Sequence, residues 1–358
     1  MNRRNFSQKL ALAGLATLGF ALPAAAEQPR KQPRRRTTAG PSLIKPRALK
    51  RGDLVGLIAP SGATDAAFVE QRVKNLEAFG FSVKVSKNIL ATRGNTAGTV
   101  SERVADIHDM FNDRNIKGIW AVRGGSGASQ LLPAINYGLI RRNPKILVGY
   151  SDVTALHLAL LRYAGLITFH GPVASADFTD YAATQLEAVL MRPRAQTTIY
   201  MSAANEIRAA TSPEFQLRTI KQGIAEGRLI GGNLSVLAAL IGTPYAADIR
   251  DAILFLEDVG EAPYRIDRML TQLEQSAPLS TVRGVMLGVF SKVVAAANEA
   301  SLTLQQTLDD HFAALDIPSI VGFSFGHIAN QFTIPVGVRA RLDTENQTLT
   351  LLESAVLG

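Results

Sequence analysis

The sequence predicts an α/β protein: a mostly parallel N-terminal sheet flanked by helices, followed by a smaller α+β C-terminal domain. From Asp53 to about residue 195, short apolar runs alternate with amphipathic segments, which is typical of repeated βα units. After that point the alternation becomes irregular, which indicates a second domain. A hydrophobic content of 47% in 358 residues is sufficient for the core of two domains or one large one.

The N-terminal elements are predicted from local patterns. Turn-forming residues bound the apolar runs: Pro60 and Gly62 end the first strand, and Gly80 ends the first helix. The predicted strands are 54–59, 81–85, 118–122 and 146–148, and the predicted helices are 66–79, 101–111 and 152–160. Parallel sheets bind ligands beyond the carboxyl ends of their strands. An Arg-Gly-Gly-Ser-Gly loop (123–127) and Ser151 both fall at that edge.

The C-terminal elements are less regular, and residues 200–228 have no clear pattern. Beyond them, the sequence predicts helices at 234–241 and 264–275, strands at 252–256 and 284–290, and a hairpin at 332–352. We therefore expect an N-terminal domain at 52–195 and a C-terminal domain at 215–358.

The first 26 residues resemble a twin-arginine export signal. Arg3 and Arg4 precede an apolar run at 10–22, and small residues follow at 24–26. The run is too short to span a bilayer, so we expect a periplasmic protein without stable membrane insertion once the signal is removed. Residues 27–51 are rich in proline and arginine, and we expect them to be a basic, solvated linker.

The charge distribution argues against a nucleic-acid partner. The chain carries a net charge of +8, but residues 1–26 contribute +3 and residues 27–51 contribute +8, which leaves −3 for the remainder. The absence of cysteine excludes disulfides and thiol nucleophiles. No paired-histidine motif indicates zinc, and the 123–127 loop lacks the lysine of a phosphate-binding loop. We therefore expect no metal and no cofactor.

Ser151 is a candidate nucleophile because it lies on a tight strand-to-helix turn, in Gly149-Tyr150-Ser151-Asp152. Such a turn lifts the hydroxyl off the sheet and directs the N–H groups of the helix N-terminus towards a developing oxyanion. The hydrolase pattern G-x-S-x-G is not met, because Val153 occupies the position of the second glycine. A helix N-cap is the alternative role for this serine.

A serine nucleophile needs a base and an acid that orients the base. Among the histidines, His170 and His327 lie at the ends of apolar segments, and their positions do not distinguish them. For the acid, Glu257 ends the strand 252–256, with Asp258 and Glu261 as close alternatives. A carboxylate that closes a buried strand must be solvated or paired.

Several segments together resemble the LD-carboxypeptidase family of serine peptidases, which includes muramoyltetrapeptide carboxypeptidases and microcin-C immunity peptidases. The resemblance covers about residues 52–355. The matching segments are GDLVGLIAPSG, AGTVSERVADIHDMF, IWAVRGGSGASQLL, ILVGYSDVTALHLAL, TFHGPV, GGNLSVLAALIGTPY, ILFLEDVGEAPYRIDRMLTQL and GFSFGHIANQFTIPVGVRARLD. No single segment is decisive, but eight in the correct order are highly specific.

The resemblance implies roles for individual residues. Ser151 would be the nucleophile, Glu257 the acid and His327 the base of a catalytic triad, in a cleft between the two domains. The oxyanion donors would be the backbone N–H groups of Asp152 and of Gly124 or Gly125. We also expect Arg123 and Asn233 to contact substrate.

The reaction that the resemblance implies is removal of the terminal D-alanine from a murein tetrapeptide through an acyl-enzyme, by a homodimer without metal. The alternatives are a microcin-C-immunity-type peptidase or amidase, which would cleave a peptide-nucleotide antibiotic, and a non-catalytic wall-binding relative. The sequence leaves open whether diaminopimelate or lysine is preferred. Ser126 occupies a position that is often aromatic in the family, so part of the substrate wall is expected to differ.

Overall fold

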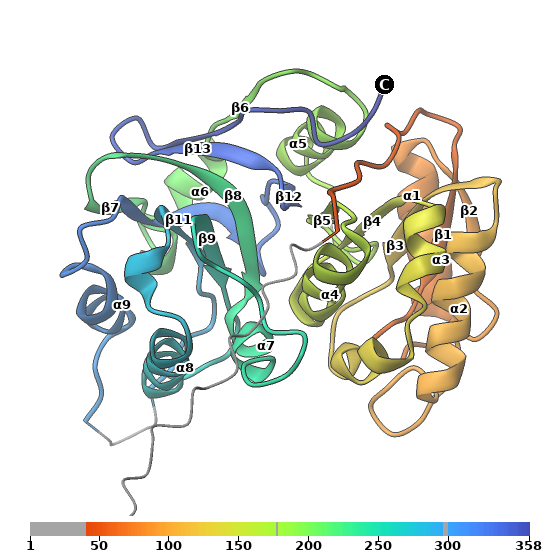
Figure 1. The fold of residues 1–358 in the computed structure, drawn as a ribbon, viewed down its shortest axis with the longest axis horizontal. Helices are drawn as coiled ribbons and strands as arrows, with labels where there is room; N and C mark the ends of the chain where they lie inside the picture. Colours follow the sequence, from red (N-terminus) through yellow and green to blue (C-terminus); the bar gives the residue numbers. More distant parts are fainter. Residues whose placement is uncertain (1–40, 177, 296–299) are drawn as a thin grey trace, which may run out of the picture. The chain divides into compact units, whose positions relative to one another are not determined.

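The computed structural model describes residues 41–176, 178–295 and 300–358, and the predicted export signal lies outside these residues. Two sheets organise this part of the chain (Figure 1). The six-stranded sheet within it has the order β12-β5-β4-β3-β1-β2. Its strands are β1 (Leu54–Ile58), β2 (Ser82–Val85), β3 (Ile116–Ala121), β4 (Ile146–Gly149), β5 (Thr168–His170) and β12 (Ile334–Val336). All pairs are parallel except β5 with β12.

Helices cover both faces of this first sheet, as the sequence predicts. They are α1 (Ala66–Phe79), α2 (Val100–Asn112), α3 (Tyr137–Arg142), α4 (Thr154–Ala164) and α5 (Asp180–Leu190), with 3₁₀ turns at Ala128–Ala134 and Ser151–Val153. Apolar residues of α2 and α4 join one core cluster, and those of α1 and α5 join the other. Thr99 begins α2 with a capping box that includes Glu102.

The second sheet, counted over the described residues, has eight strands in the order β6-β14-β13-β8-β9-β10-β11-β7. The strands are β6 (Thr197–Ile199), β7 (Arg218–Lys221), β8 (Ile224–Asn233), β9 (Ala252–Glu257), β10 (Gly284–Val289), β11 (Ser319–Gly326), β13 (Arg339–Asp343) and β14 (Thr348–Leu351). The four central strands β8 to β11 are parallel, and the flanking pairs are antiparallel. The predicted fold class is confirmed, but the centre of the second sheet contains more βα units than the expected α+β arrangement.

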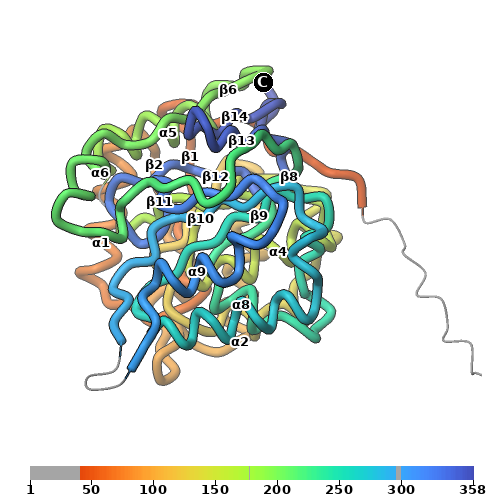
Figure 2. The backbone as a smooth tube through the Cα atoms, turned by 90° about the vertical axis from the view of Figure 1, so that its left-hand side faces the viewer, coloured from red at the N-terminus to blue at the C-terminus, as the bar shows by residue number. Residues whose placement is uncertain are grey.

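Helices α7 (Leu234–Ala239), α8 (Pro263–Ser276) and α9 (Leu304–Phe312) connect the central strands and cover one face of the second sheet, where α8 and α9 lie side by side (Figure 2). The short α6 (Ala203–Arg208) and 3₁₀ turns at Pro213–Phe215 and Leu279–Thr281 complete the elements. Strand β9 is buried on both faces: Leu254 and Leu256 join the cluster with these helices, and Ile253 and Phe255 join the cluster that contains α1 and α5.

The two sheets are connected by a strand that crosses from the C-terminal half of the chain into the first sheet, and they also share a hydrophobic core. Strand β12 belongs to the C-terminal half but pairs with β5 of the first sheet, and residues 40–358 form one compact unit. The tail folds as the predicted hairpin only over β13 and β14. No helix in the described ranges is long and apolar enough to span a bilayer.

The expected linker at 27–51 requires a correction over residues 41–51, which pack on the folded unit. Leu49 is 1% exposed, Ile44 and Arg47 form backbone bridges with Leu166 and Leu357, and Lys45 pairs with Glu353 at 2.7 Å. Apolar burial and backbone pairing therefore outweigh the basic, proline-containing composition of this stretch. Residues 27–40 of the expected linker lie outside the described residues.

Candidate active site

The turn that carries Ser151 has the geometry of a nucleophile elbow. Strand β4 ends at Gly149, and Ser151 adopts a left-handed backbone conformation with φ of 64°, which is unusual for a residue with a side chain. A Cβ atom on Gly149 would lie 2.8 Å from the Val153 Cγ1 atom. The tight turn therefore depends on glycine at 149, and Val153 fills the space that this glycine leaves.

Glu257 ends β9 and is fully buried. Its Oε2 atom lies 2.7 Å from the Nδ1 atom of His327, and its Oε1 atom has no hydrogen-bond partner among the described residues. The two alternative acids have other contacts: Asp258 accepts hydrogen bonds from Ser235 and Asn233, and Glu261 pairs with Arg265 at 3.5 Å. Of the three acids, Glu257 is the one that contacts an imidazole of the candidate site.

His327 follows β11 and connects the two halves of the site. Its Nε2 atom lies 3.0 Å from the Ser151 Oγ atom, so Glu257, His327 and Ser151 form a continuous chain of hydrogen bonds. The Tyr150 ring packs edge-on against the imidazole at a centroid distance of 4.8 Å. The structure thus brings together the three residues that the sequence analysis selected for the triad.

His170, the alternative base, lies elsewhere. It is fully buried, packs against Tyr150, Phe255 and Phe325, and neither ring nitrogen has a hydrogen-bond partner in the described ranges. Burial holds the pKa of His170 well below its usual range, and His157 and His327 lower this pKa further. His327, and not His170, is within hydrogen-bonding distance of Ser151.

The predicted oxyanion donors lie beside the serine. A Cβ atom on Gly124 would be 2.8 Å from the Ser151 Cβ and 3.0 Å from its Oγ, so the backbone of this loop contacts the nucleophile. Gly125 has φ of 132°, and a Cβ atom there would lie 2.9 Å from Gly62. The Asp152 amide follows the serine in the chain. The backbone at Gly124 and the Asp152 amide thus lie close to the serine, and their role as oxyanion donors stays a prediction.

The carboxylate of Asp152 has a positioning role that the sequence analysis missed. It is buried, and its Oδ2 accepts a hydrogen bond of 2.8 Å from the backbone N–H of Ala128, at the end of the 123–127 loop. Arg103 of α2 lies on the other side of this loop and donates to the carbonyls of Pro60 and Gly127 at 2.9 and 3.0 Å. Burial lowers the pKa of Arg103, and the charge of Asp152 opposes this shift. The signal in the sequence that could have indicated this arrangement is Arg103, a charged residue on the apolar side of the helix predicted at 101–111.

Arg123 and Asn233, the two expected substrate contacts, are not among the residues that line the cleft at His327. The Arg123 guanidinium lies over the Phe68 ring and contacts the Ala63 carbonyl. Asn233 is 4% exposed because it caps α7 and donates to Asp258 at 3.0 Å. Both side chains thus contact neighbouring parts of the protein, and their expected contact with substrate stays a prediction.

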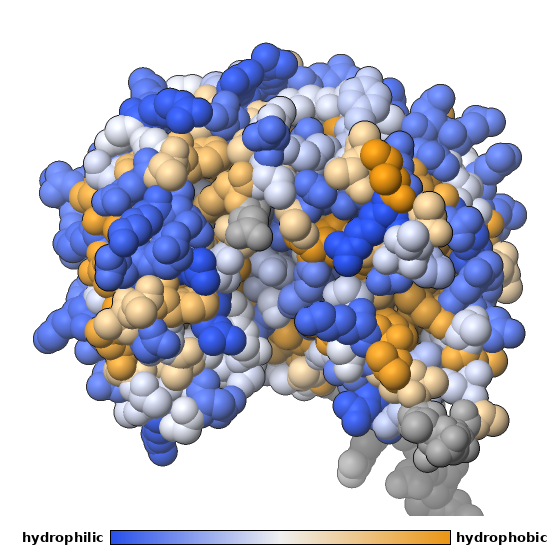
Figure 3. Space-filling view, turned by 180° about the vertical axis from the view of Figure 1, so that it is seen from behind, coloured by the Kyte–Doolittle hydropathy of each residue, from blue (hydrophilic) through white to orange (hydrophobic). Residues whose placement is uncertain are grey.

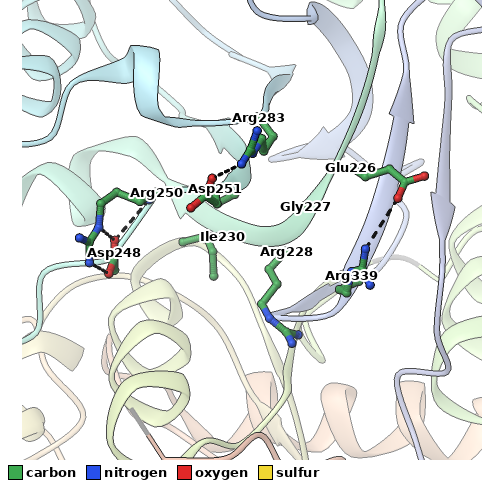
Figure 4. Close-up of a pocket in the computed structure, with 10 residues that line it drawn as sticks. Glu226, Gly227, Arg228, Ile230, Asp248, Arg250, Asp251, Arg283 and Arg339 are labelled. Atoms are coloured by element: carbon green, nitrogen blue, oxygen red, sulfur yellow. Dashed lines mark hydrogen bonds and ion pairs between the residues drawn. The ribbon is translucent and has the colours of Figure 1, made fainter. Parts of the chain in front are cut away.

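Two cavities differ in position and lining. A cavity of about 320 Å³ lies at the triad and is lined by Tyr150 and His327. A larger one, of about 540 Å³, lies at the opposite ends of β8 and β9 (Figure 4). Charged groups in it pair with one another, as in the contacts of Arg283 with Asp251 and of Arg339 with Glu226. We assign the candidate chemistry to the smaller cavity, because it is lined by His327, whose Nε2 atom lies 3.0 Å from the Ser151 hydroxyl.

One face of the molecular surface is recessed. Seen from behind, it is hollowed near its middle, with hydrophilic and hydrophobic side chains around the hollow (Figure 3). Across the described part of the chain, no group of three or more histidine, aspartate or glutamate side chains is arranged to hold a metal ion.

Comparisons with known proteins identify the family. The model of the LD-carboxypeptidase N-terminal domain matches residues 55–171, and the model of the C-terminal domain matches residues 226–342. A protein of Bacillus subtilis described as a probable murein peptide carboxypeptidase is 37% identical over 308 residues, which cover 86% of this chain and 94% of that protein. The murein tetrapeptide carboxypeptidase of Pseudomonas aeruginosa is 33% identical and covers 81% of this chain and 92% of its own length.

Among solved structures, the crystal structure of an MccF-like protein from Bacillus anthracis superposes with a TM-score of 0.75 at 30% identity, over 87% of this chain and 99% of that one. Fold and site thus define a two-sheet α/β peptidase. The chain belongs to the LD-carboxypeptidase family, which confirms the resemblance predicted from its motifs.

Proposed function

We propose that this protein is a serine L,D-carboxypeptidase that removes the terminal D-alanine from murein tetrapeptides. The observation that supports it most directly is the hydrogen-bond chain from Glu257 through His327 to Ser151, with distances of 2.7 and 3.0 Å. The names of the relatives, which include a murein tetrapeptide carboxypeptidase, support the substrate class.

In the proposed reaction, Ser151 Oγ attacks the carbonyl carbon of the last peptide bond and transfers its proton to Nε2 of His327. Glu257 holds the imidazole through Nδ1 and stabilises its charged form. The oxyanion accepts hydrogen bonds from the backbone N–H groups of Asp152 and of Gly124 or Gly125. His327 then protonates the leaving amine of D-alanine, and water that His327 activates hydrolyses the acyl-enzyme.

The test follows D-alanine release from a disaccharide-free tetrapeptide by mass spectrometry, with the purified protein and with Ser151→Ala. We expect release by the wild-type protein only. Absence of release by the wild type would refute the proposed activity, and equal release by the variant would refute Ser151 as the nucleophile. Parallel substrates with diaminopimelate or lysine at the third position would show which is preferred.

A second candidate activity, cleavage of an amide in a peptide-nucleotide antibiotic, is favoured by the similarity to an MccF-like structure. The same triad could perform it, because both substrates have an acyl group bonded to nitrogen. An aminoacyl sulfamoyl nucleoside in the same assay distinguishes the two activities. Cleavage of this compound without release of D-alanine from the tetrapeptide would favour the second candidate, and cleavage of neither would favour a non-catalytic wall-binding relative.

The proposed setting is the periplasm, reached by the twin-arginine route, where the enzyme would act as a homodimer on wall peptides. The arginine pair at 3 and 4 before the apolar run 10–22 supports export. Cell fractionation of the full chain and of a variant with both arginines changed to lysine tests it. Retention of the wild-type chain in the cytoplasm would refute export, and sedimentation of the purified protein as a monomer would refute the dimer.

A further inference from the structure

The cavity at the triad contains charged side chains that the proposed chemistry does not use. Besides Tyr150 and His327, it is lined by the basic residues Arg208 and Lys292 and by one acid, Glu214. Neither basic side chain forms an ion pair with another residue in the described ranges. This lining suits a ligand that carries a carboxylate group close to the reacting bond.

The proposed reaction determines which side of the serine binds the leaving group. The leaving nitrogen must be near His327 Nε2, because this atom donates the proton to it. In a carboxypeptidase substrate, the terminal carboxylate is two covalent bonds from that nitrogen. The carboxylate must therefore enter the cavity that His327 lines, and the oxyanion donors at Gly124 and Asp152 contact the other side of the carbonyl.

Lys292 follows β10, and its neighbour Ser291 is hydrogen-bonded to the segment that comes after Glu257. It adopts a left-handed backbone conformation with φ of 56°, which costs about 1 kcal/mol or more for a residue with a side chain. The preceding residue, Ser291, donates to the Asp258 carbonyl at 3.1 Å and accepts from the Gly260 N–H at 2.9 Å. The backbone of Lys292 is thus held by the segment that directly follows Glu257.

Arg208 is supported from a different direction. It ends α6, and its guanidinium carbon lies 4.4 Å from the centroid of the Phe215 ring. Phe215 is 3% exposed and belongs to the small core cluster that contains Ile328, next to the catalytic histidine. Stacking on a buried ring restricts the guanidinium while its N–H donors remain available in the cavity.

We infer that Lys292 and Arg208 bind the α-carboxylate of the leaving residue and so restrict the enzyme to peptides with a free carboxyl terminus. This inference rests on the proposed carboxypeptidase function and assigns a specificity-determining role within it. A hydrogen bond or ion pair to a carboxylate would form at one or both side chains. Glu214 in the same cavity would disfavour a second carboxylate and favour an ammonium group.

The experiment compares two substrates that differ only at the carboxyl terminus: the tetrapeptide that ends in D-alanine and the same peptide that ends in D-alaninamide. The proteins are the wild type, Lys292→Met, Arg208→Met, the double variant and the conservative Lys292→Arg. A charge-matched control is Arg194→Met, at an exposed position outside helices and strands. For the wild type we expect kcat/KM to be about 10- to 100-fold higher on the acid, which is the range for hydrogen bonds to a charged group.

In the double variant we expect kcat/KM on the acid to fall by about the same factor, mainly through KM, and kcat/KM on the amide to change little. Lys292→Arg should retain the preference for the acid, and so should Arg194→Met. A purely structural effect would lower both activities together. If the wild type cleaves the acid and the double variant keeps the full preference for the acid over the amide, the inference is wrong and the proposed function stands. A wild type inactive on both substrates would overturn the proposed function as well.

Discussion

Gly124 approaches the side chain of Ser151 so closely that a Cβ atom on the glycine would lie 2.8 Å from the serine Cβ and 3.0 Å from Oγ. Real Cβ atoms do not approach other atoms to 2.8 Å, so any other residue at 124 would displace the serine. Gly124 is not among the glycines with a positive φ, which means that its backbone conformation would accept a side chain. Space for the nucleophile, and not backbone conformation, therefore requires glycine here.

Gly124→Ala should consequently retain the fold and lose most of its activity. We expect kcat for D-alanine release to fall by about 10²- to 10³-fold, the loss typical for disturbance of one oxyanion donor. The free energy of unfolding should fall by about 1–3 kcal/mol, the usual cost of overpacking. Steady-state kinetics and urea unfolding measure the two effects. Gly138→Ala, at an exposed position of α3, is the control: it should leave kcat unchanged and should not lower stability, because alanine is the better helix former.

Glu257→Gln removes the charge of the proposed triad acid and keeps its size, so it tests the effect of the charge. The amide has nearly the same volume, but it can donate to Nδ1 of His327 and so stabilise the wrong tautomer for proton transfer from Ser151. We expect kcat to fall by about 10³- to 10⁴-fold with little change in KM. A variant that retained more than a tenth of wild-type kcat would show that the 2.7 Å contact does not orient the base.

Much of this candidate site could be predicted because each side chain of the proposed triad lies at the end of a locally recognisable strand. Ser151 follows β4 of the first sheet, whereas Glu257 ends β9 and His327 follows β11 in the second sheet. In each sheet, the parallel strands place such residues at the carboxyl edge. The choice between His170 and His327 depends on a contact across 176 residues, between Ser151 and His327, which no local pattern contains.

The features that were missed depend on long-range packing. Strand β12 has only three residues, one of them Pro335, and no pattern indicates that it joins the first sheet and not the second. Residues 41–51 have the composition of a linker, yet Leu49 is buried in the folded unit. The hydrogen bond from Ala128 to Asp152 crosses 24 positions, and the sequence analysis considered only the backbone N–H of Asp152.

The buried histidines predict how stability depends on pH. Burial lowers the pKa of His157 to about 4, whereas its unfolded value is about 6.5. Between these pH values the unfolded chain therefore binds more protons than the folded one. The free energy of unfolding is highest above pH 6.5 and falls as the pH is lowered towards 4. His157 accounts for about 3 kcal/mol of this loss. The pKa of His170 is shifted in the same direction, so it adds to the loss.

Urea unfolding at several pH values from 7.5 to 4.5 measures this dependence. His157→Gln should be less stable than the wild type at pH 7.5, because the wild-type imidazole forms hydrogen bonds of 2.9 Å with Thr168 and Gly149. Its stability should also fall less steeply below pH 6.5, because the titrating group is gone. Parallel curves for the two proteins would contradict the prediction.

Gly326 precedes His327 and packs closely against Glu257, so it affects the contact between these two residues. Its φ is 122°, and a Cβ atom on it would lie 2.8 Å from the Val289 carbonyl oxygen and 3.3 Å from the Glu257 Cβ. Both the backbone conformation and the neighbouring atoms therefore require glycine. In Gly326→Ala, relief of the clash would move Glu257 or the segment that carries His327, and either movement would break the hydrogen-bond chain to Ser151.

We expect Gly326→Ala to lose about 1–3 kcal/mol of stability and at least about 100-fold in kcat, because even small misplacement of reacting groups has that effect. Gly242→Ala is the control: Gly242 also has a positive φ, of 85°, but a Cβ atom there meets nothing within 4 Å. It should show a similar loss of stability and nearly wild-type kcat. Equal kcat values for the two variants would mean that the clash at Glu257 is accommodated without movement of the triad.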